Sequence, residues 1–217
     1  MNKNHKSFIC GIKGKYLTKS EKKFLIKYKP WGVILFSRNI ISIKQTKILT
    51  NSIKKLFKNN NYPILIDEEG GRVTRLKKFI DNSIFTAKYF GDLYSKNNKK
   101  FEIYFNVYVK QISYLLRTLG ININTVPVLD IRRSKSHSII GDRSYSSNKK
   151  IVSKIGDICI EKFHKNRIAT VMKHIPGHGL AKSDSHKNLP IINKKIDYLV
   201  KNDFYTFKNK NSLIAMT

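Results

Sequence analysis

The sequence predicts an α/β fold of the (β/α)8 TIM-barrel type that is incomplete, with about six of the eight β-α units. Short, almost wholly apolar runs alternate with longer segments of helical periodicity, as expected for parallel strands joined by helices. Polar residues gather directly after these runs, and the carboxyl ends of barrel strands form the active face of such folds. The alternation also fits a doubly wound sheet, and the polar clusters favour the barrel. A barrel usually needs about 250 residues, so 217 residues with six strands predict that two units are missing.

The first half of the chain predicts three strands and two helices. The first helix follows a capping box, in which Thr18 is the N-cap and Glu21 stands three residues later. Residues 43–58 are predicted to form the second helix, because one of its faces is apolar. A long loop is expected over roughly 70–98. The predicted strands are the apolar runs 8–12, 31–36 and 63–67.

The second half predicts three more strands, with helices between them. Residues 101–118 have one apolar face, and Gly120 stands where a helix C-cap belongs. The two later helices are marked by apolar residues at helical spacing: Ile151, Ile155, Ile158 and Phe163 in one, and Ile196, Leu199, Val200, Phe204 and Phe207 in the other. The predicted strands are 121–129, 169–173 and 212–217. No low-complexity linker interrupts the pattern, so residues 1–217 are interpreted as a single domain.

The formal net charge of +29 is the most unusual feature of the composition. Such a charge favours polyanionic partners, either nucleic acid or an anionic membrane surface. The lysines, however, are spread over predicted helices and loops and do not form one arginine-rich stripe. Lysine, asparagine and isoleucine are all abundant and share A/T-rich codons, so compositional drift accounts for the charge. We therefore expect no specific nucleic-acid partner and no membrane partner, and a polyanion site remains the alternative.

Compartment and cofactor content are predicted from what the sequence lacks. Cys10 and Cys159 do not make a disulfide framework, which fits a reducing compartment. The apolar run near the N-terminus is shorter than a signal peptide needs, and no run approaches the roughly 18 apolar residues of a membrane span. We expect a cytoplasmic protein with no cofactor and no metal, monomeric if complete.

Three consecutive carboxylates, Asp67, Glu68 and Glu69, follow the third predicted strand and precede two glycines. Burying them would be expensive without partners. An aspartate that leaves a strand end can accept hydrogen bonds from sugar hydroxyls, and the glycines allow a sharp turn. The alternative is an acidic turn that pairs with Arg72 and Arg75.

A second polar motif lies after the fourth predicted strand, in the loop that contains Asp142 and Arg143. The planar fork of an arginine can hold a carboxylate or several hydroxyls in a fixed geometry. The alternative is a structural clamp between Asp142 and Arg143 within the loop.

The strongest chemical signal lies between Lys173 and His186, where three of the six histidines fall within thirteen residues. Asp184 precedes His186 by two residues and could orient its imidazole and stabilise the charged form. A histidine so placed titrates near neutrality and suits proton transfer. Proline and glycine exclude a helix here, so His174 and His178 are not a helical zinc pair. The alternatives are a metal site made of His174, His178, Asp184 and His186, or a polar loop.

Five motifs, taken in order, resemble the N-terminal barrel domain of glycoside hydrolase family 3. The sequence DSH at 184–186 resembles the β-N-acetylhexosaminidase branch of that family. The resemblance implies a retaining hydrolase that removes terminal non-reducing β-linked N-acetylglucosamine from peptidoglycan (muropeptide) fragments in the cytoplasm. The motifs are GVILFSRN (32–39), ILIDEEGGRVTRL (64–76), NTVPVLDI (124–131), IIGDRSY (139–145) and KHIPGHG (173–179).

The resemblance also implies a role for individual residues. His186 would be the general acid/base, with Asp184 as its partner in a dyad. This dyad takes the place of one of the two carboxyl groups that retaining glycosidases usually use. The residues implied to bind the terminal sugar are Asp67, Arg75, Arg143, Lys173 and His174.

The sequence departs from the family pattern in two places. Glu68 stands where the family usually has glutamine, and we expect it to add a charge near the sugar site. The family's nucleophile, an aspartate on a seventh strand, has no counterpart before Thr217, and Asp130 and Asp142 match structural positions. We expect this chain alone to be inactive and poorly stable. The alternatives are a catalytically dead remnant that binds sugars or polyanions, and phosphorolysis, because a histidine acid/base tolerates an anionic phosphate.

Overall fold

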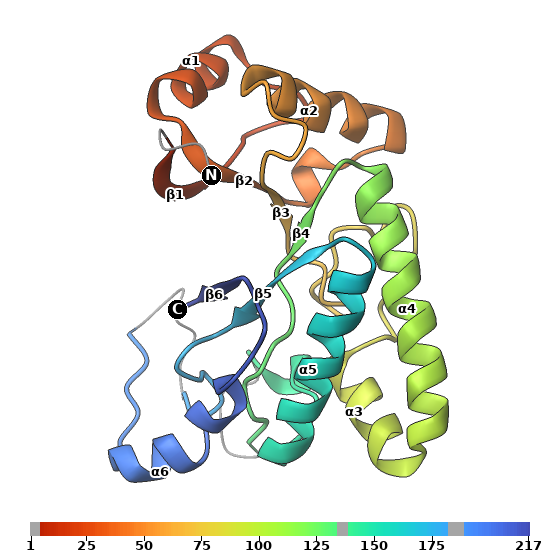
Figure 1. Ribbon diagram of the computed structural model, residues 1–217, viewed down its shortest axis with the longest axis vertical. Coiled ribbons are helices and arrows are strands. Elements are labelled where there is room, and N and C mark those ends of the chain that lie inside the picture. The colour runs from red at the N-terminus through yellow and green to blue at the C-terminus, as the bar shows by residue number, and fades with distance from the viewer. Residues whose placement is uncertain (1–4, 134–138, 182–188) are drawn as a thin grey trace.

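The computed structural model describes residues 5–133, 139–181 and 189–217. Within these residues, six strands form one sheet in sequential order, and every neighbouring pair is parallel (Figure 1). This order excludes a doubly wound sheet, whose strand order reverses at a switch point. The prediction of an incomplete (β/α)8-type barrel is therefore confirmed. The strands are β1 (Lys6–Gly11), β2 (Pro30–Leu35), β3 (Ile64–Ile66), β4 (Ile123–Asn124), β5 (Ala169–Lys173) and β6 (Ile214–Met216).

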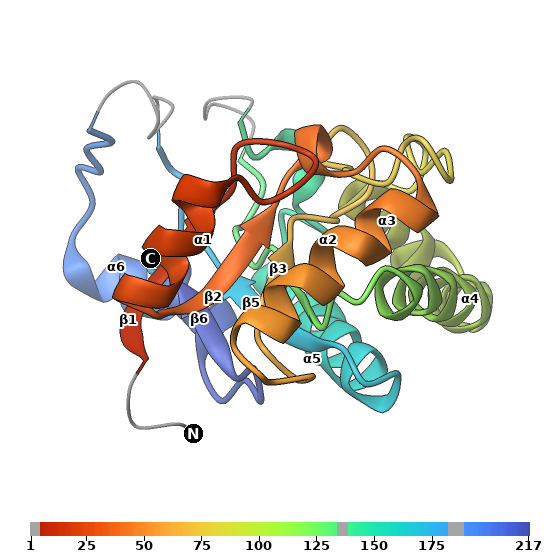
Figure 2. The same cartoon turned by 90° about the horizontal axis from the view of Figure 1, so that it is seen from above.

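Helices lie around the outside of the curled sheet (Figures 1 and 2). In the described ranges, the α-helices are α1 (Lys19–Tyr28), α2 (Ile43–Leu56), α3 (Ala87–Lys96), α4 (Asn98–Thr118), α5 (Lys149–Lys165) and α6 (Ile196–Lys201). Three short 3-10 helices complete the elements: η1 (Ser37–Asn39), η2 (Gly141–Arg143) and η3 (Phe204–Phe207). No helix in these ranges has both the length and the apolar character that a bilayer crossing requires.

Two helix boundaries follow the signals in the sequence. Thr18 accepts a hydrogen bond from the backbone N–H of Glu21 at 3.1 Å, and the Glu21 carboxylate accepts one from the Thr18 N–H at 2.8 Å. This reciprocal pair is the predicted capping box at the start of α1. At the C-terminal end of α4, Gly120 has a φ of 78°, a left-handed conformation that favours glycine and ends the helix.

Three predicted elements differ from the structure. The expected loop over 70–98 contains α3, which Thr86 caps by accepting from the N–H of Tyr89. The strand expected over 121–129 is reduced to β4, and beyond it the pairing with β5 continues only as a single parallel bridge between Val128 and Lys173. The helix expected from Ile196 to Phe207 is divided into α6 and η3, which are separated by two residues.

Alternate residues of the central strands face two different apolar clusters. Ile64 and Ile66 belong to the large cluster between the sheet and the helices. Leu65 belongs to a smaller cluster with Ile123 and Val171, which fills the inside of the curled sheet. Successive side chains of a strand point to opposite faces. Consecutive residues at the ends of β3 and β5 therefore point their side chains alternately towards the inside of the curled sheet and towards the helices.

Candidate active site

The five residues that the sequence predicts to bind a sugar line one pocket, at the carboxyl ends of the strands. The pocket has a volume of about 380 Å³, which lies within the usual range for small-molecule sites. Its position agrees with the polar clusters that follow the predicted strands. The shared lining residues are Asp67, Arg75, Arg143, Lys173 and His174. Their role in sugar binding stays a prediction.

Lys173 is the most buried cation of the pocket, with its side chain 2% exposed. Its Nζ lies 3.1 Å from Asp67 Oδ1, 2.6 Å from Glu69 Oε1 and 2.9 Å from the hydroxyl of Thr125. Asp67 also accepts from the Thr125 hydroxyl, and the Arg75 guanidinium lies 3.6 Å from Asp67 Oδ2. Burial alone would raise the pKa of Asp67, but Lys173 and Thr125 hold that pKa below its usual value. Asp67 is therefore an ionised acceptor at neutral pH.

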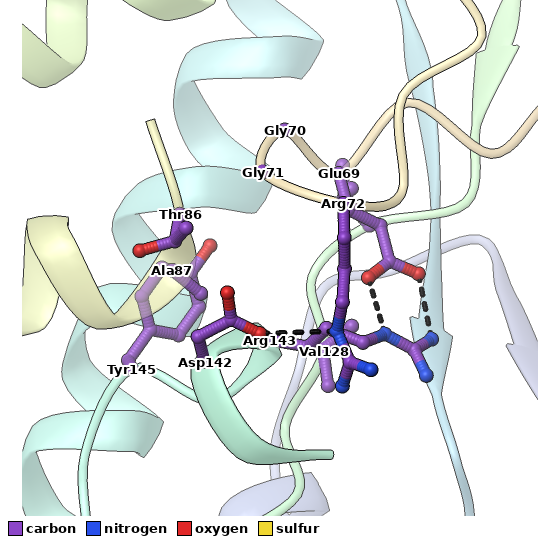
Figure 3. Close-up of a pocket in the computed structure, with 11 residues that line it drawn as sticks. Glu69, Gly70, Gly71, Arg72, Thr86, Ala87, Val128, Asp142, Arg143 and Tyr145 are labelled. Carbon is purple, nitrogen blue, oxygen red and sulfur yellow. Dashed lines mark hydrogen bonds and ion pairs between the residues drawn. The ribbon is translucent and has the colours of Figure 1, made fainter. Parts of the chain in front are cut away.

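Glu69 and Arg143 form a bidentate ion pair (Figure 3), with both N···O distances at 2.8 Å. The Glu69 side chain is 5% exposed and also contacts Lys173. Burial would raise the pKa of Glu69, but Lys173 and Arg143 together lower it. Two cations of the pocket are thus fixed by one carboxylate, in the fork geometry that arginine provides.

The alternatives considered for these loops are only partly met. Arg75 does pair with the acidic turn, through Asp67. Arg72, by contrast, reaches Asp142, with 3.1 Å between Arg72 Nε and Asp142 Oδ1 (Figure 3). The alternative of a clamp between Asp142 and Arg143 is wrong, because Arg143 pairs with Glu69, which lies in the turn after β3.

Asp130 is the functional candidate that the sequence did not single out. It is 1% exposed, and its Oδ2 lies 2.6 Å from His174 Nδ1 while its Oδ1 accepts from the backbone N–H of His178 at 2.6 Å. Arg143 can only donate, and its Nη2 lies 3.5 Å from His174 Nε2. The proton of a neutral His174 therefore belongs on Nδ1, and the Nε2 lone pair faces Arg143. The signals in the sequence were its position at a strand end and its place in the motif NTVPVLDI, where the resemblance implied a structural position.

Glu68 does not line the pocket, which corrects the expectation that it adds a charge near the sugar site. Asp67 and Glu69 continue the side of the strand on which Leu65 lies, inside the curled sheet. Glu68 continues the opposite side and borders a small cavity with Phe90 of α3 and with Phe105 and Tyr108 of α4.

The predicted acid/base pair, Asp184 and His186, lies outside the described residues. The part of the chain that the structure does describe holds no group of histidines, cysteines and carboxylates suited to a metal ion. The metal alternative depends on the same two residues and stays an alternative. Among the described members of this alternative, His174 contacts Asp130 through Nδ1, and its Nε2 faces the Arg143 guanidinium. That guanidinium disfavours a cation at Nε2.

Comparison with known protein families gives a match over nearly the whole chain. A model of the glycosyl hydrolase family 3 N terminal domain matches residues 11–214. The chain is 30% identical over 189 residues to beta-hexosaminidase A of Pseudoalteromonas piscicida, covering 85% of this chain and 31% of that protein. It is 31% identical over 180 residues to a beta-hexosaminidase of Thioalkalivibrio sulfidiphilus, covering 83% and 51% respectively.

Solved structures agree with these matches. NagZ from Neisseria gonorrhoeae, in complex with N-trifluoroacetyl-D-glucosamine, is similar with a TM-score of 0.89 at 28% identity, covering 98% of this chain and 63% of that one. A glycoside hydrolase family 3 β-N-acetylglucosaminidase from Paenibacillus sp. has a TM-score of 0.81 at 27% identity, covering 92% and 37%. The chain thus spans between 31% and 63% of the length of these four relatives.

Proposed function

The chain belongs to glycosyl hydrolase family 3, and from this premise we propose that it forms the sugar-binding part of a retaining β-N-acetylglucosaminidase. The proposed substrate is a peptidoglycan (muropeptide) fragment with a terminal, non-reducing, β-linked N-acetylglucosamine. The observation that carries the proposal is the convergence of Asp67, Arg75, Arg143, Lys173 and His174, from three separate motifs, on one pocket.

The pocket suits a sugar because its donors and acceptors are fixed before a ligand enters. Lys173 and Arg143 are held by Glu69, and His174 is held by Asp130. A preorganised set of this kind loses little conformational freedom on binding. Arg75 lines the same pocket with its side chain 25% exposed, so the outer N–H groups of its guanidinium can donate to a sugar hydroxyl.

For catalysis, we propose His186 as the general acid/base and Asp184 as the carboxylate that orients it. An imidazole exchanges protons near neutral pH, which suits protonation of a departing oxygen. A retaining mechanism also needs a carboxylate nucleophile. The pocket carboxylates are already engaged: Asp67 and Glu69 with Lys173, and Asp130 with His174. The family resemblance implies instead an aspartate on a seventh strand, and we propose that residue as the nucleophile.

Calorimetry with N-acetylglucosamine tests the sugar site on the 217-residue chain. We choose Arg75→Gln, because the 3.6 Å between the Arg75 guanidinium and Asp67 Oδ2 is too long for a hydrogen bond, so the change breaks none between them. Loss of a hydrogen bond from a charged donor should weaken sugar binding by about tenfold or more. Asp197→Asn, an exposed change on α6, is the matched control and should bind as the parent does. Equal affinities for Arg75→Gln and the parent would overturn the assignment of this pocket.

The acid/base assignment needs a form of the protein with measurable turnover, for which the chain extended through its downstream reading frame is the natural choice. A chromogenic N-acetyl-β-glucosaminide should report hydrolysis, and His186→Ala should lower kcat by about 10²–10⁴-fold. Turnover that His186→Ala leaves unchanged would remove His186 from the mechanism. Added phosphate that accelerates turnover would favour phosphorolysis over hydrolysis.

The net charge of +29 is the observation that favours the second candidate, a remnant that binds polyanions. Binding of duplex DNA that weakens steeply between two salt concentrations would support it, since phosphate contacts release counterions. We expect no such binding, and we propose a monomer that acts in the cytoplasm. The free thiols of Cys10 and Cys159 agree with a reducing compartment.

A further inference from the structure

Glu68 is a buried carboxylate whose partners are all uncharged. It is 1% exposed. Its Oε1 accepts from the Thr74 hydroxyl at 2.8 Å and from the Asn82 side-chain amide at 3.1 Å. Its Oε2 accepts from two backbone N–H groups, those of Arg75 at 2.7 Å and Leu76 at 3.0 Å. Four donors on two oxygens are the complement of an ionised carboxylate.

The same residue joins the sheet to the loop that carries Arg75. The Glu68 backbone is clamped by the side chain of Asn124 in β4, which accepts from its N–H at 3.0 Å and donates to its carbonyl at 2.9 Å. The Glu68 side chain accepts hydrogen bonds from residues 74, 75, 76 and 82 and so holds these parts of the loop together. Arg75 is fixed through its own backbone N–H, so its guanidinium leaves the loop at a defined place beside Asp67.

The titratable groups around Glu68 are neutral or already paired. Tyr108 of α4, Cys159 of α5 and Tyr145 border the same small cavity, and burial raises the pKa of each of them. Glu69 is neutralised by Lys173 and Arg143. Burial raises the pKa of Glu68 above its usual value, against the opposing effect of its four hydrogen bonds.

We propose that Glu68 is a positioning residue for the sugar site: its carboxylate never touches the sugar, but it fixes the loop that presents Arg75 to the pocket. This inference rests on the proposed sugar-binding function. It separates the three consecutive carboxylates by task, because Asp67 and Glu69 order the pocket cations and Glu68 orders the loop.

Glu68→Gln and Glu68→Ala distinguish this role from simple filling of space. A glutamine oxygen can accept from the Arg75 and Leu76 N–H groups. Its amide can donate to the Thr74 hydroxyl and, once the Asn82 side-chain amide turns by 180°, to Oδ1 of Asn82, which is buried and lacks a partner in the described chain. Glu68→Gln should therefore keep the loop, whereas Glu68→Ala leaves four donors without an acceptor. Asp81→Asn, an exposed change in the same loop that still caps Ser83, is the matched control.

Hydrogen exchange of the Arg75 and Leu76 amides reads the loop without any sugar. In Glu68→Ala these two amides should exchange roughly tenfold faster or more, relative to amides of β3, and they should stay protected in Glu68→Gln and Asp81→Asn. Calorimetry with N-acetylglucosamine should show the same order, with a loss of about tenfold or more in Glu68→Ala alone. Unchanged exchange in Glu68→Ala overturns the proposal. Absent sugar binding in the parent, with fast exchange in Glu68→Ala, instead overturns the proposed function and leaves the loop assignment standing.

The pH profile of stability keeps the proposal falsifiable if Glu68→Ala does not fold. Because the folded pKa of Glu68 is raised, the cost of ionising it is absent below the unfolded value of 4.5 and appears as pH rises through the folded value. The urea midpoint of the parent should therefore fall, relative to that of Glu68→Gln, as pH rises from about 4.5 towards 7. Parallel profiles would contradict a raised pKa of Glu68, and fast exchange of the Arg75 and Leu76 amides in folded Glu68→Gln would overturn the proposal.

Discussion

Two ion pairs lie close together at the carboxyl ends of the strands and differ mainly in burial (Figure 3). In the Glu69–Arg143 fork, the side chains are 5% and 14% exposed, and Lys173 joins it at 2.6 Å. In the Arg72–Asp142 pair, a few residues away along the same two loops, the side chains are 46% and 40% exposed. Both pairs join a guanidinium to a carboxylate, and the buried pair is in addition bidentate and joined by Lys173.

Burial makes the first pair part of the site and leaves the second as a surface contact. Charges removed from water interact strongly and cannot be left without a partner, whereas an exposed pair is screened and typically contributes about 0–1 kcal/mol. The buried network therefore determines where the pocket cations stand. The exposed pair only ties the loop of η2 to the turn after β3, with help from the Ile139 and Ile140 carbonyls.

The largest effect is expected from Lys173→Met, which removes the cation between two buried carboxylates. Breaking a buried pair by deleting one partner typically costs about 3–5 kcal/mol of unfolding free energy. Asp67 and Glu69 have lowered pKa values, so the stability that they contribute is present above their usual pKa values and is lost as pH falls through the folded values. Urea unfolding should show the full loss at pH 7 and a smaller one in acid.

Lys100→Met is the matched control, because Lys100 is exposed in the first turn of α4. Its unfolding free energy should stay within about 0.5 kcal/mol of the parent value. A similar loss in both variants, or a loss in Lys173→Met that does not shrink in acid, would contradict the view that the buried charges dominate.

A smaller effect is expected from Asp130→Asn, about 1–3 kcal/mol of stability, because a buried hydrogen-bonding pair becomes mismatched. The asparagine oxygen must remain opposite the His178 N–H, which can only donate. Its amide then faces His174 and requires the tautomer with the proton on Nε2. That proton would point at the Arg143 guanidinium, so we expect sugar affinity to fall as well.

Nitrogen NMR of the imidazoles measures this directly. The parent should show the Nδ1–H form of His174, and Asp130→Asn should show the Nε2–H form or a mixture. An unchanged tautomer would mean that Asp130 does not control the ring. His164→Gln is the control, because His164 contacts Thr170 away from the pocket.

The sequence predicts best where a physical signal is local. The apolar run 169–173 is β5 with identical bounds, and Asp67 and Lys173 meet because parallel strand ends share one edge of the sheet. The partner of Glu69 was not predictable in the same way, since Arg143 is 74 residues away and reaches it only through the path of a loop.

Signals that depend on packing were also missed. Gly91 lies in the middle of α3 and weakens any helix prediction there. Its reason appears only in the fold, where a Cβ at this position would lie 1.6 Å from the carbonyl oxygen of Tyr145. The opposite directions of Glu68 and Glu69, in contrast, follow from strand alternation. They could have been predicted had the alternation of β3 been continued beyond its end.

The smallest effect is expected from Asp142→Asn, which changes the exposed ion pair between Arg72 and Asp142. Asparagine still offers an oxygen to Arg72 Nε, and water screens the charge that is lost, so the unfolding free energy should change by less than about 1 kcal/mol. The same urea unfolding at low and high salt should bring the variant and the parent closer together as salt rises, since screening weakens only the pair that retains its charge. A loss as large as that of Lys173→Met, independent of salt, would show that loop connectivity, and not exposure, decides what an ion pair contributes at this end of the sheet.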